Sequence, residues 1–402
     1  MAKAPADGGS KAIRFTGHHN FRYRIMLSLL AQRAIHISGI RSNSEDPGIK
    51  DFEVSFLRLI ERITNGTLVE ISYTGTEVYI RPGMISCGKV QHECPTSRGV
   101  GWFLEPLLVL GLFGKQPLNL TLKGITSNTR DVSADTLRTA YLPLLSTFLP
   151  STVTQPLELR IVKRGLLPGG GGEINYISPS IRTVKPGYNF VQPGSINKIR
   201  GIAHAVRVSP TFSQRLVNGA KEVLTPLCSD CRIYTDVYRG AESGKSPGFG
   251  LTLVATSTTT AIHSSEAVST PPSDSKDADS TSASNANKTP EELGAQAAFE
   301  LLDNISRGSC VDKGMEWMAC LLIALGSEDV GRVRIAGPLD AVLVRFLRDL
   351  KDFLGITMKI RPVEDAAKAR QTTEDEADMT SNEAYILSCV GIGYSNIAKK
   401  TT

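Results

Sequence analysis

The charged residues Arg348, Asp349 and Lys351 combine side-chain types that could act on a phosphate. Two cations can bind phosphate oxygens, and a carboxylate can accept a proton. Metal-free cleavage of RNA also needs an acid for the leaving oxygen, and no histidine follows His263 in the chain. Cleavage with two metal ions needs several convergent carboxylates, whereas this motif supplies one. The three residues therefore lack several of the groups that either cleavage mechanism needs.

The same three residues lie on a predicted amphipathic helix over residues 339–354. Because Leu347 and Leu350 are expected to face the core, the charged side chains should lie on the opposite, solvated face. Arg348 is an i,i+3 neighbour of Lys351 and can also reach the carboxylate four residues further on. A salt-bridged helix surface is the plain alternative to a functional site.

A second candidate is the segment 20–25, in which basic and aromatic residues alternate. Arg22 and Arg24 can pair with phosphates, and the rings between them can stack on bases. Alternation of this kind is also typical of a half-buried surface. The segment by itself leaves both interpretations open.

The remaining motifs carry little chemistry. The glycine run 169–172 could let backbone approach a phosphate, but it also follows a proline-glycine turn signal. Residues 243–246 end like a P-loop without the required spacing. Cys228 and Cys231 form a lone C-x-x-C, and a structural zinc site needs a second pair. We therefore predict no metal site and no cofactor.

The elements that position these residues follow a strand, helix, strand, strand pattern that recurs four times. The predicted helices are residues 49–63, 134–147, 211–224 and 339–354. In each copy we expect the strands flanking the helix to pair in parallel through a right-handed crossover. The pattern predicts stacked α/β units, each with helices on one face of a small sheet.

Composition sets broad limits. A chain of 402 residues with 41% hydrophobic residues suggests two or three domains with sizeable cores. A net charge of +5 fits RNA binding but equally fits a solvated enzyme surface. The seven cysteines lack disulfide spacing and no signal peptide is seen, which predicts a reducing intracellular compartment. No apolar stretch is long enough to predict a membrane span.

Two polar segments predict flexible chain. Residues 256–289 are dense in Ser, Thr, Asp, Ala and Pro, and such a composition cannot bury enough apolar surface to offset the cost of ordering. We expect a disordered linker there. A second, acidic loop is expected over residues 372–381.

Several segments, in order along the chain, resemble one known family. The run K-R-G-L-L-P-G-G-G-G-E, residues 163–173, is similar to the R-G-x-x-P-x-G-G-G signature of RNA 3'-terminal phosphate cyclases. Residues 98–106, 123–126 and 246–250 also match, and the resemblance extends over about residues 15–393. Those cyclases carry AMP on a histidine of a C-terminal helix, whereas the matching stretch here begins Lys313-Gly314-Met315.

The resemblance implies a fold. It is an α/β fold of the α+β type, in which copies one, two and four form a large domain and copy three is an inserted smaller domain of the same pattern. The expected limits are a flexible N-terminus at 1–14, the large domain at 15–190 and 291–402, the small domain at 191–262, and a disordered linker at 263–290.

The resemblance also implies a function. The chain is most similar to a eukaryotic, nucleolar branch of the family without cyclase activity. This implies a ribosome biogenesis factor of the small-subunit processome that supports processing of pre-ribosomal RNA. The implied partners are a large nucleolar GTPase, pre-ribosomal RNA and a small nucleolar ribonucleoprotein, and no membrane.

The implied site residues remain open between two roles. If the repeats stack as in the family, the residues contacting RNA phosphates would be Arg22, Arg24, Arg41, Arg98, Lys163 and Arg164. Arg348, Asp349 and Lys351 would either dock a partner or form the centre of an endoribonuclease that cuts the first internal transcribed spacer. An active cyclase is a third, disfavoured alternative, because the nucleophilic histidine is missing.

Overall fold

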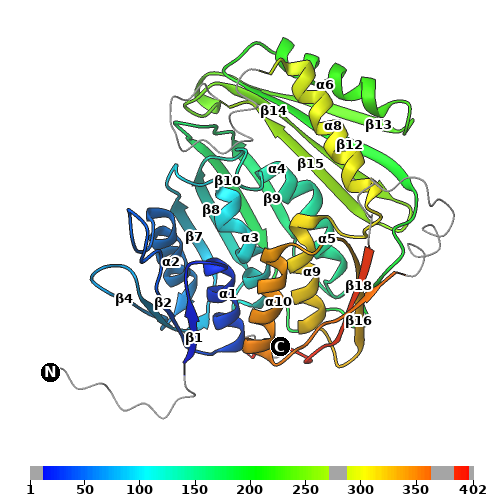
Figure 1. Ribbon diagram of the computed structural model, residues 1–402. Helices are drawn as coiled ribbons and strands as arrows, with labels where there is room; N and C mark the ends of the chain where they lie inside the picture. Colours follow the sequence, from blue (N-terminus) through cyan, green and yellow to red (C-terminus); the bar gives the residue numbers. More distant parts are fainter. Residues whose placement is uncertain (1–11, 271–287, 364–383, 398–402) are drawn as a thin grey trace.

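The computed structural model describes residues 12–270, 288–363 and 384–397. They form four four-stranded sheets and one two-stranded ribbon, with helices packed between the sheets. Figure 1 shows helices between the sheets in the lower part of the molecule, and further helices on the outer face of the sheet at its top. This mixed α/β architecture of several small sheets is the predicted fold class.

The first unit has the sheet order β1-β2-β5-β4. Its elements are β1 (Ile13–Thr16), α1 (Phe21–Ala31), β2 (Ile35–Ser38), α2 (Asp51–Ile63), β4 (Leu68–Ile71) and β5 (Val78–Arg81). The ribbon of β3 (Thr64–Asn65) and β6 (Met84–Ile85) follows α2 and precedes the second unit.

The second unit has the order β7-β8-β10-β9. Its elements are β7 (Gly88–Glu93), α3 (Val100–Leu110), β8 (Leu118–Gly124), α4 (Ala134–Thr136), α5 (Leu142–Thr147), β9 (Glu158–Lys163) and β10 (Gly172–Ser178). A π-helical turn, residues 137–141, joins α4 to α5, so the single helix predicted at 134–147 is continuous but irregular.

The fourth unit has the order β11-β16-β18-β17. Its elements are β11 (Asn189–Phe190), α9 (Glu316–Leu325), β16 (Val330–Ala336), α10 (Ala341–Leu354), β17 (Lys359–Pro362) and β18 (Ala384–Val390). Local signals define α10 well, because the Asp340 side chain caps its first turn and Gly355 ends it in the left-handed conformation, φ 72°.

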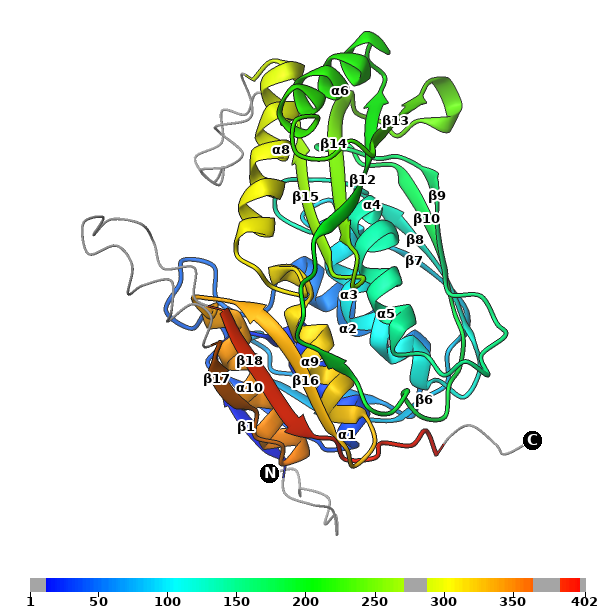
Figure 2. The same ribbon diagram turned by 90° about the vertical axis from the view of Figure 1, so that its right-hand side faces the viewer.

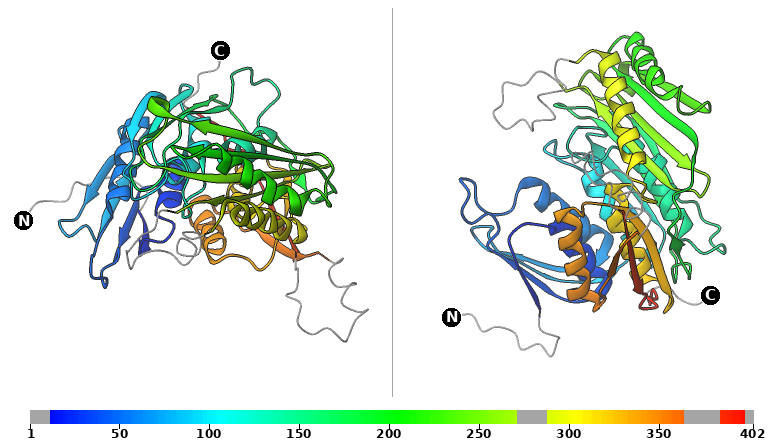
Figure 3. Two further views of the ribbon diagram at one scale, coloured as in Figure 1. Left: turned by 90° about the horizontal axis from the view of Figure 1, so that it is seen from above. Right: turned by 45° about the vertical axis from the view of Figure 1, so that its right-hand side comes forward.

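The third unit forms a separate lobe, at the top of Figure 1. Its elements are β12 (Ile196–Val206), α6 (Thr211–Leu224), β13 (Cys231–Tyr238), β14 (Gly248–Ser257), β15 (Ile262–Val268) and α8 (Pro290–Ser306), with the sheet order β13-β12-β14-β15. We call it the small lobe, and units one, two and four together the large lobe. Figure 2 and Figure 3 show the small lobe standing on the large one.

The predicted parallel pairing is right in the third copy and wrong in the other three. In the small lobe β12 and β13 pair in parallel along their length. In the other units the last strand lies between the two that flank the helix, as β5 does between β2 and β4, and pairs antiparallel with both. The parallel crossovers of the first two units are made instead by α1, between β1 and β2, and α3, between β7 and β8.

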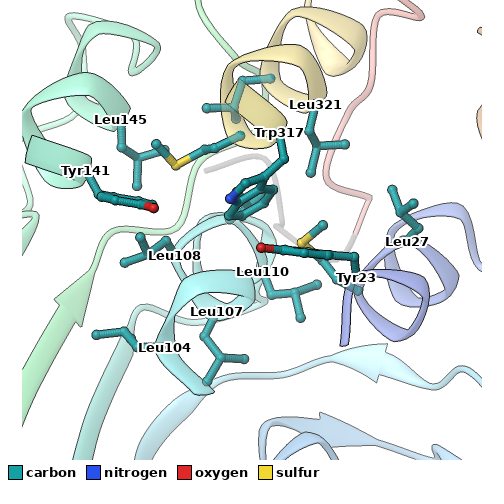
Figure 4. Packing of buried hydrophobic residues seen from close by; sticks show 14 of the residues in the cluster. Tyr23, Leu27, Leu104, Leu107, Leu108, Leu110, Tyr141, Leu145, Trp317 and Leu321 are labelled. Atoms are coloured by element: carbon teal, nitrogen blue, oxygen red, sulfur yellow. The ribbon is translucent and has the colours of Figure 1, made fainter. Parts of the chain in front are cut away.

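The helices that the repeat pattern missed form the centre of the large lobe. Every residue of α3 and of α9 is buried. A helix that is apolar all round has no amphipathic period, so periodicity could not find it. Figure 4 shows Tyr23 of α1, Trp317 of α9 and Tyr141 pointing into one core with the leucines of α3. The rings of Tyr23 and Trp317 lie 4.8 Å apart.

The small lobe has a hydrophobic core of its own. Buried side chains of β12 and β14 meet those of α6 and α8, and both helices lie on the same face of the sheet. The two helices approach closely because Gly219 of α6 and Gly294 of α8 face each other; a methyl group at Gly294 would lie 2.2 Å from the backbone oxygen of Leu216.

Three of the expected limits need correction. Residues 13–16 form β1, so the chain is ordered before residue 15. Ile262–Val268 is a strand of the small lobe, and α8 packs into the core of that lobe rather than of the large one. The expected linker therefore does not begin at 256 or 263, because a serine- and threonine-rich strand can be buried in a sheet. Residues 271–287 and the acidic loop at 372–381 lie outside the described residues.

Candidate functional site

A polar cleft of about 480 Å³ opens where the central helices converge. It is lined by residues of α1, the start of α3, the loop before α4, the segment before α9 and the start of α10. The ionisable lining residues are Arg22, Arg98, Glu105, Arg130, Asp131, Lys313, Glu316 and Asp340. Segments far apart in the sequence thus bring four cations and four carboxylates to one place.

Arg22 lies in the wall of this cleft with its charge already paired. Its guanidinium forms an ion pair with Glu105, which is 6% exposed, and donates to the carbonyl oxygen of Trp102 at 2.6 Å. It also lies over the ring of Trp102. Burial raises the pKa of Glu105, and Arg22 opposes that shift. The pair holds α1 against α3.

Arg98 has a similar arrangement on the other side of the cleft. Its Nη2 lies 2.9 Å from Asp131 Oδ1, and its guanidinium lies over the rings of Phe52 and Trp102. Burial lowers the pKa of Arg98 to about 10, and Asp131 opposes that shift. The Asp131 carboxylate also accepts a hydrogen bond from the backbone N–H of Gly99 at 2.7 Å.

Asp349 is buried, and the prediction that it faces solvent is wrong. It is 3% exposed, and its carboxylate accepts hydrogen bonds from Arg24 Nε at 3.2 Å and Asn20 Nδ2 at 3.0 Å. Burial raises the pKa of Asp349, and Arg24 and Asn20 restrain the shift. The positions of Leu347 and Leu350 predict that this face of α10 is exposed to solvent. In the structure, part of this face packs on α1.

The neighbours of Asp349 do face solvent. Arg348 and Lys351 are exposed, as predicted. Among the described residues no ion pair joins Arg348 to Asp352, so the expected salt bridge along the helix does not form. The three residues thus separate into one buried carboxylate and two exposed surface cations.

Arg164 links the two lobes. Its side chain is 1% exposed and forms an ion pair with Asp135 of α4 in the large lobe. Its Nη2 and Nε also donate to Asp236 Oδ2 of β13 in the small lobe, at 2.8 Å and 2.9 Å. Arg164 therefore holds the small lobe against the large lobe through the ion pairs of its buried side chain.

The glycine run and the rejected P-loop segment meet at the same junction. The backbone N–H groups of Gly244 and Lys245 donate to the carbonyl oxygens of Arg164 and Gly170, at 2.7 Å and 2.9 Å. A methyl group at Gly165 would lie 2.2 Å from a backbone nitrogen of the run. Two motifs weighed separately in the sequence thus form one backbone contact between the lobes.

The other two predicted RNA-binding residues lie away from the cleft lining. Arg41 makes a two-fold hydrogen-bonded ion pair with Glu53 at 2.7 Å and 2.8 Å. Lys163 is half-buried, and no ion pair of it is found among the described residues. The structure brings Arg22 and Arg98 together at the cleft, with Arg24 behind them, and does not gather the six residues into one patch.

Lys313 lies in the cleft, in the stretch where the resembling cyclases carry a histidine. It is exposed, at the start of a 3₁₀ turn capped by Asp312. Glu316 is 2% exposed, and its Oε1 has no hydrogen-bond partner among the described residues. Burial, with a smaller contribution from Asp312, raises the pKa of Glu316 to about 8. None of the six histidines lines the cleft.

In the part of the chain that the structure describes, neither a metal-ion site nor a membrane-spanning helix is found. No three His, Cys, Asp or Glu side chains gather there in a way that could hold a metal ion. None of the described helices has the length and apolar character needed to cross a membrane.

Sequence reasoning missed the carboxylates that pair with the arginines. Glu105 had a usable signal, because it is the ionisable residue of an otherwise apolar α3. Asp131, Asp135 and Asp236 had none, since each sits in a polar local context. Their partners come from other elements.

Comparisons with known proteins identify one family over most of the chain. The sequence profile of the family "RNA 3'-terminal phosphate cyclase" matches residues 13–360. A "Probable RNA 3'-terminal phosphate cyclase-like protein" of Dictyostelium discoideum is 40% identical over 97% of this chain and 100% of its own length. The "RNA 3'-terminal phosphate cyclase-like protein" of Homo sapiens is 40% identical over 96% and 98%.

A third relative has a name that states a process. The "rRNA processing protein rcl1" of Schizosaccharomyces pombe is 40% identical over 96% of this chain and 98% of its own length. The similarity therefore extends over both lobes.

We expect Asp349→Ala to unfold the chain far more readily than substitutions beside it. Removing one partner of a buried ion pair leaves Arg24 uncompensated, which costs about 3–5 kcal/mol, whereas Arg348→Ala and Lys351→Ala should each stay within about 0.5 kcal/mol. Urea denaturation measures the difference. The apolar pair Arg24→Met/Asp349→Leu should recover part of the loss; equal stability of Asp349→Ala and Arg348→Ala would contradict the assignment.

We expect Glu316→Gln to stabilise the chain at pH 8. The folded pKa near 8 lies above the unfolded value near 4.3, so the proton bound in the folded state adds stability that is full below pH 4 and is lost as pH rises through 8. Glutamine stays neutral, so its advantage should grow from pH 5 to pH 8 to at least about 1 kcal/mol. Exposed Glu61→Gln is the control, and parallel stability curves for Glu316→Gln and wild type would refute the expectation.

Proposed function

Since the chain belongs to the RNA 3'-terminal phosphate cyclase family, we propose that it is a non-cyclase member that acts in ribosome biogenesis. In this proposal it works in the nucleolus, within the small-subunit processome, and supports processing of pre-ribosomal RNA toward small-subunit rRNA. It does so by binding a large nucleolar GTPase and pre-ribosomal RNA, beside a small nucleolar ribonucleoprotein.

The observation that carries the proposal is a family cleft without a histidine, in a chain whose near full-length relatives include an rRNA processing protein. The AMP-carrying step of the cyclases needs a nucleophile at that place. Lys313, exposed and beside Glu316, stands there instead. The scaffold is kept and the group that defines the cyclase reaction is replaced.

The endoribonuclease alternative depends on Asp349 as the base. A general base must reach the proton that it removes. Both carboxylate oxygens of Asp349 accept hydrogen bonds from Arg24 or Asn20, and the residue is 3% exposed. This arrangement favours a structural carboxylate. The exposed cations Arg348 and Lys351 are then left as a docking surface.

The RNA contacts remain part of the proposal in a narrower form. Arg22 and Arg98 line the cleft and can present an edge of the guanidinium to a phosphate while keeping their carboxylates. Arg24, Arg41 and Arg164 use their charge inside the protein.

We expect Arg348→Ala/Lys351→Ala to weaken binding of the GTPase partner by at least about tenfold, since each charge-assisted hydrogen bond that is lost costs about 1.5–3 kcal/mol. The double variant keeps Asp349, so its fold is preserved. Pull-down of the GTPase and cleavage of a transcript spanning the first internal spacer are measured on the same preparation. The control Lys198→Ala/Lys221→Ala removes the same charge from exposed positions of the small lobe. Unchanged GTPase and RNA binding with abolished cleavage would support the endoribonuclease instead.

We also expect no adenylylation. Incubation with radiolabelled ATP and Mg²⁺ should leave the protein unlabelled, because no histidine lines the cleft. A covalent AMP adduct that survives denaturation would overturn this part of the proposal, and its loss in Lys313→Ala would identify the nucleophile.

A further inference from the structure

A second polar groove lies on the large lobe, away from the cleft. It has a volume of about 370 Å³ and runs between α2 and the strands β7 and β8. Its lining includes Ser55, Arg58, Arg62, His92, Glu93 and Lys123. Figure 1 shows α2 lying beside β7 at the left of the large lobe. We call this the α2–β8 groove.

Among the described residues, the two arginines of this groove have no carboxylate partner, whereas Arg22 and Arg98 of the cleft each have one. Arg58 and Arg62 are exposed, and among the described residues neither forms an ion pair. They are i,i+4 neighbours, so both project from one face of α2. Arg62 also donates to the carbonyl oxygen of Gln91 at 2.7 Å, which covers the free edge of β7.

Lys123 supplies the third charge from the opposite wall. It is 53% exposed, and its nearest carboxylate, Glu173, lies 4.0 Å away and is itself 30% exposed. Exposed pairs of this kind contribute little and exchange readily with other anions. Glu93 is the carboxylate in the lining, so the groove keeps an excess of positive charge.

His92, in the wall of the groove, is affected by the positive charges of Arg58 and Arg62. It is 7% exposed, and its Nε2 lies 2.8 Å from Ser55 Oγ. Burial lowers the pKa of His92 to about 4, and the charges of Arg62 and Arg58 add to the shift. Two guanidinium groups therefore stand close to a neutral ring.

The chemistry of the lining favours a nucleic-acid backbone over a protein. All the residues of the groove are polar or charged, with no apolar side chain among them. A protein partner usually needs an apolar or aromatic anchor. Phosphate oxygens need only cations and hydrogen-bond donors, and such contacts carry no sequence preference.

We infer that the α2–β8 groove binds the sugar-phosphate backbone of single-stranded RNA through Arg58, Arg62 and Lys123. The inference rests on the proposed function, in which RNA is a partner. It locates an RNA-binding surface outside the cleft. It also gives RNA a contact that does not depend on Arg24, Arg41 and Arg164, whose charges are paired inside the protein.

The test uses the full chain and a fluorescein-labelled oligouridylate. Arg58→Gln/Lys123→Gln removes two contacts and leaves Arg62 on the β7 edge. For single strands each contact contributes about 0.7 to the slope of log K against log salt, so the slope should fall by about 1.4 and affinity about 25-fold at about 0.1 M salt. Lys198→Gln/Lys221→Gln, with the same charge change on the small lobe, should leave both unchanged.

Each outcome decides something. Equal losses in the two variants, or no loss in the first, overturn the groove while leaving the proposed function intact. Absence of RNA binding by the wild-type protein overturns the groove and the RNA part of the proposed function together. Weaker binding of the GTPase but not of RNA in Arg58→Gln/Lys123→Gln would make the groove a protein-docking surface and refute the inference.

Discussion

A guanidinium taken out of water must have a carboxylate beside it, and that constraint organises this molecule. The desolvation cost of a buried ion is several kcal/mol and is offset only by good geometry with an opposite charge. Here the carboxylate comes from another element each time. Arg22 meets Glu105, which joins unit one to unit two; Arg24 meets Asp349, which joins unit one to unit four; and Arg164 meets Asp135 and Asp236, which joins the two lobes. The stacking of the repeats is specified by pairs of charges as well as by apolar contact.

This constraint changes how charged motifs should be interpreted. A basic residue in a family signature is easily taken for a ligand contact, as Arg164 was. In the structure its guanidinium donates four hydrogen bonds, two to Asp135 and two to Asp236. The glycines that follow Arg164 allow the backbone of the signature run to contact the loop 243–246. The signature run therefore connects the two lobes. The two surfaces proposed for partners are the exposed cations Arg348 and Lys351 of α10 and the α2–β8 groove.

In the proposed function, the cleft is a family scaffold without the histidine that the cyclase reaction uses. Its walls are still built by α1, α3 and the segment before α9, and they still hold closely spaced charges. A histidine is not among the lining residues, and burial raises the pKa of Glu316 there to about 8. The cavity is polar and lined by side chains of both charge signs, and in the proposed function it positions an anion without forming a covalent bond with it.

The sequence by itself determined the four repeats, the limits of α2, α6 and α10 to within about two residues, the family, and the absence of a histidine near Lys313. Those features are local: amphipathic periods, caps and motifs are written in neighbouring residues. Only the tertiary structure decided that Asp349 is buried, that α8 belongs to the small lobe, and that the last strand of three copies inserts between the other two. The partner of Asp349 is Arg24, more than three hundred residues away in sequence. From the apolar residues of α10 alone, every other position of the helix is predicted to face solvent. Nothing in the neighbouring sequence shows that the guanidinium of Arg24 covers Asp349.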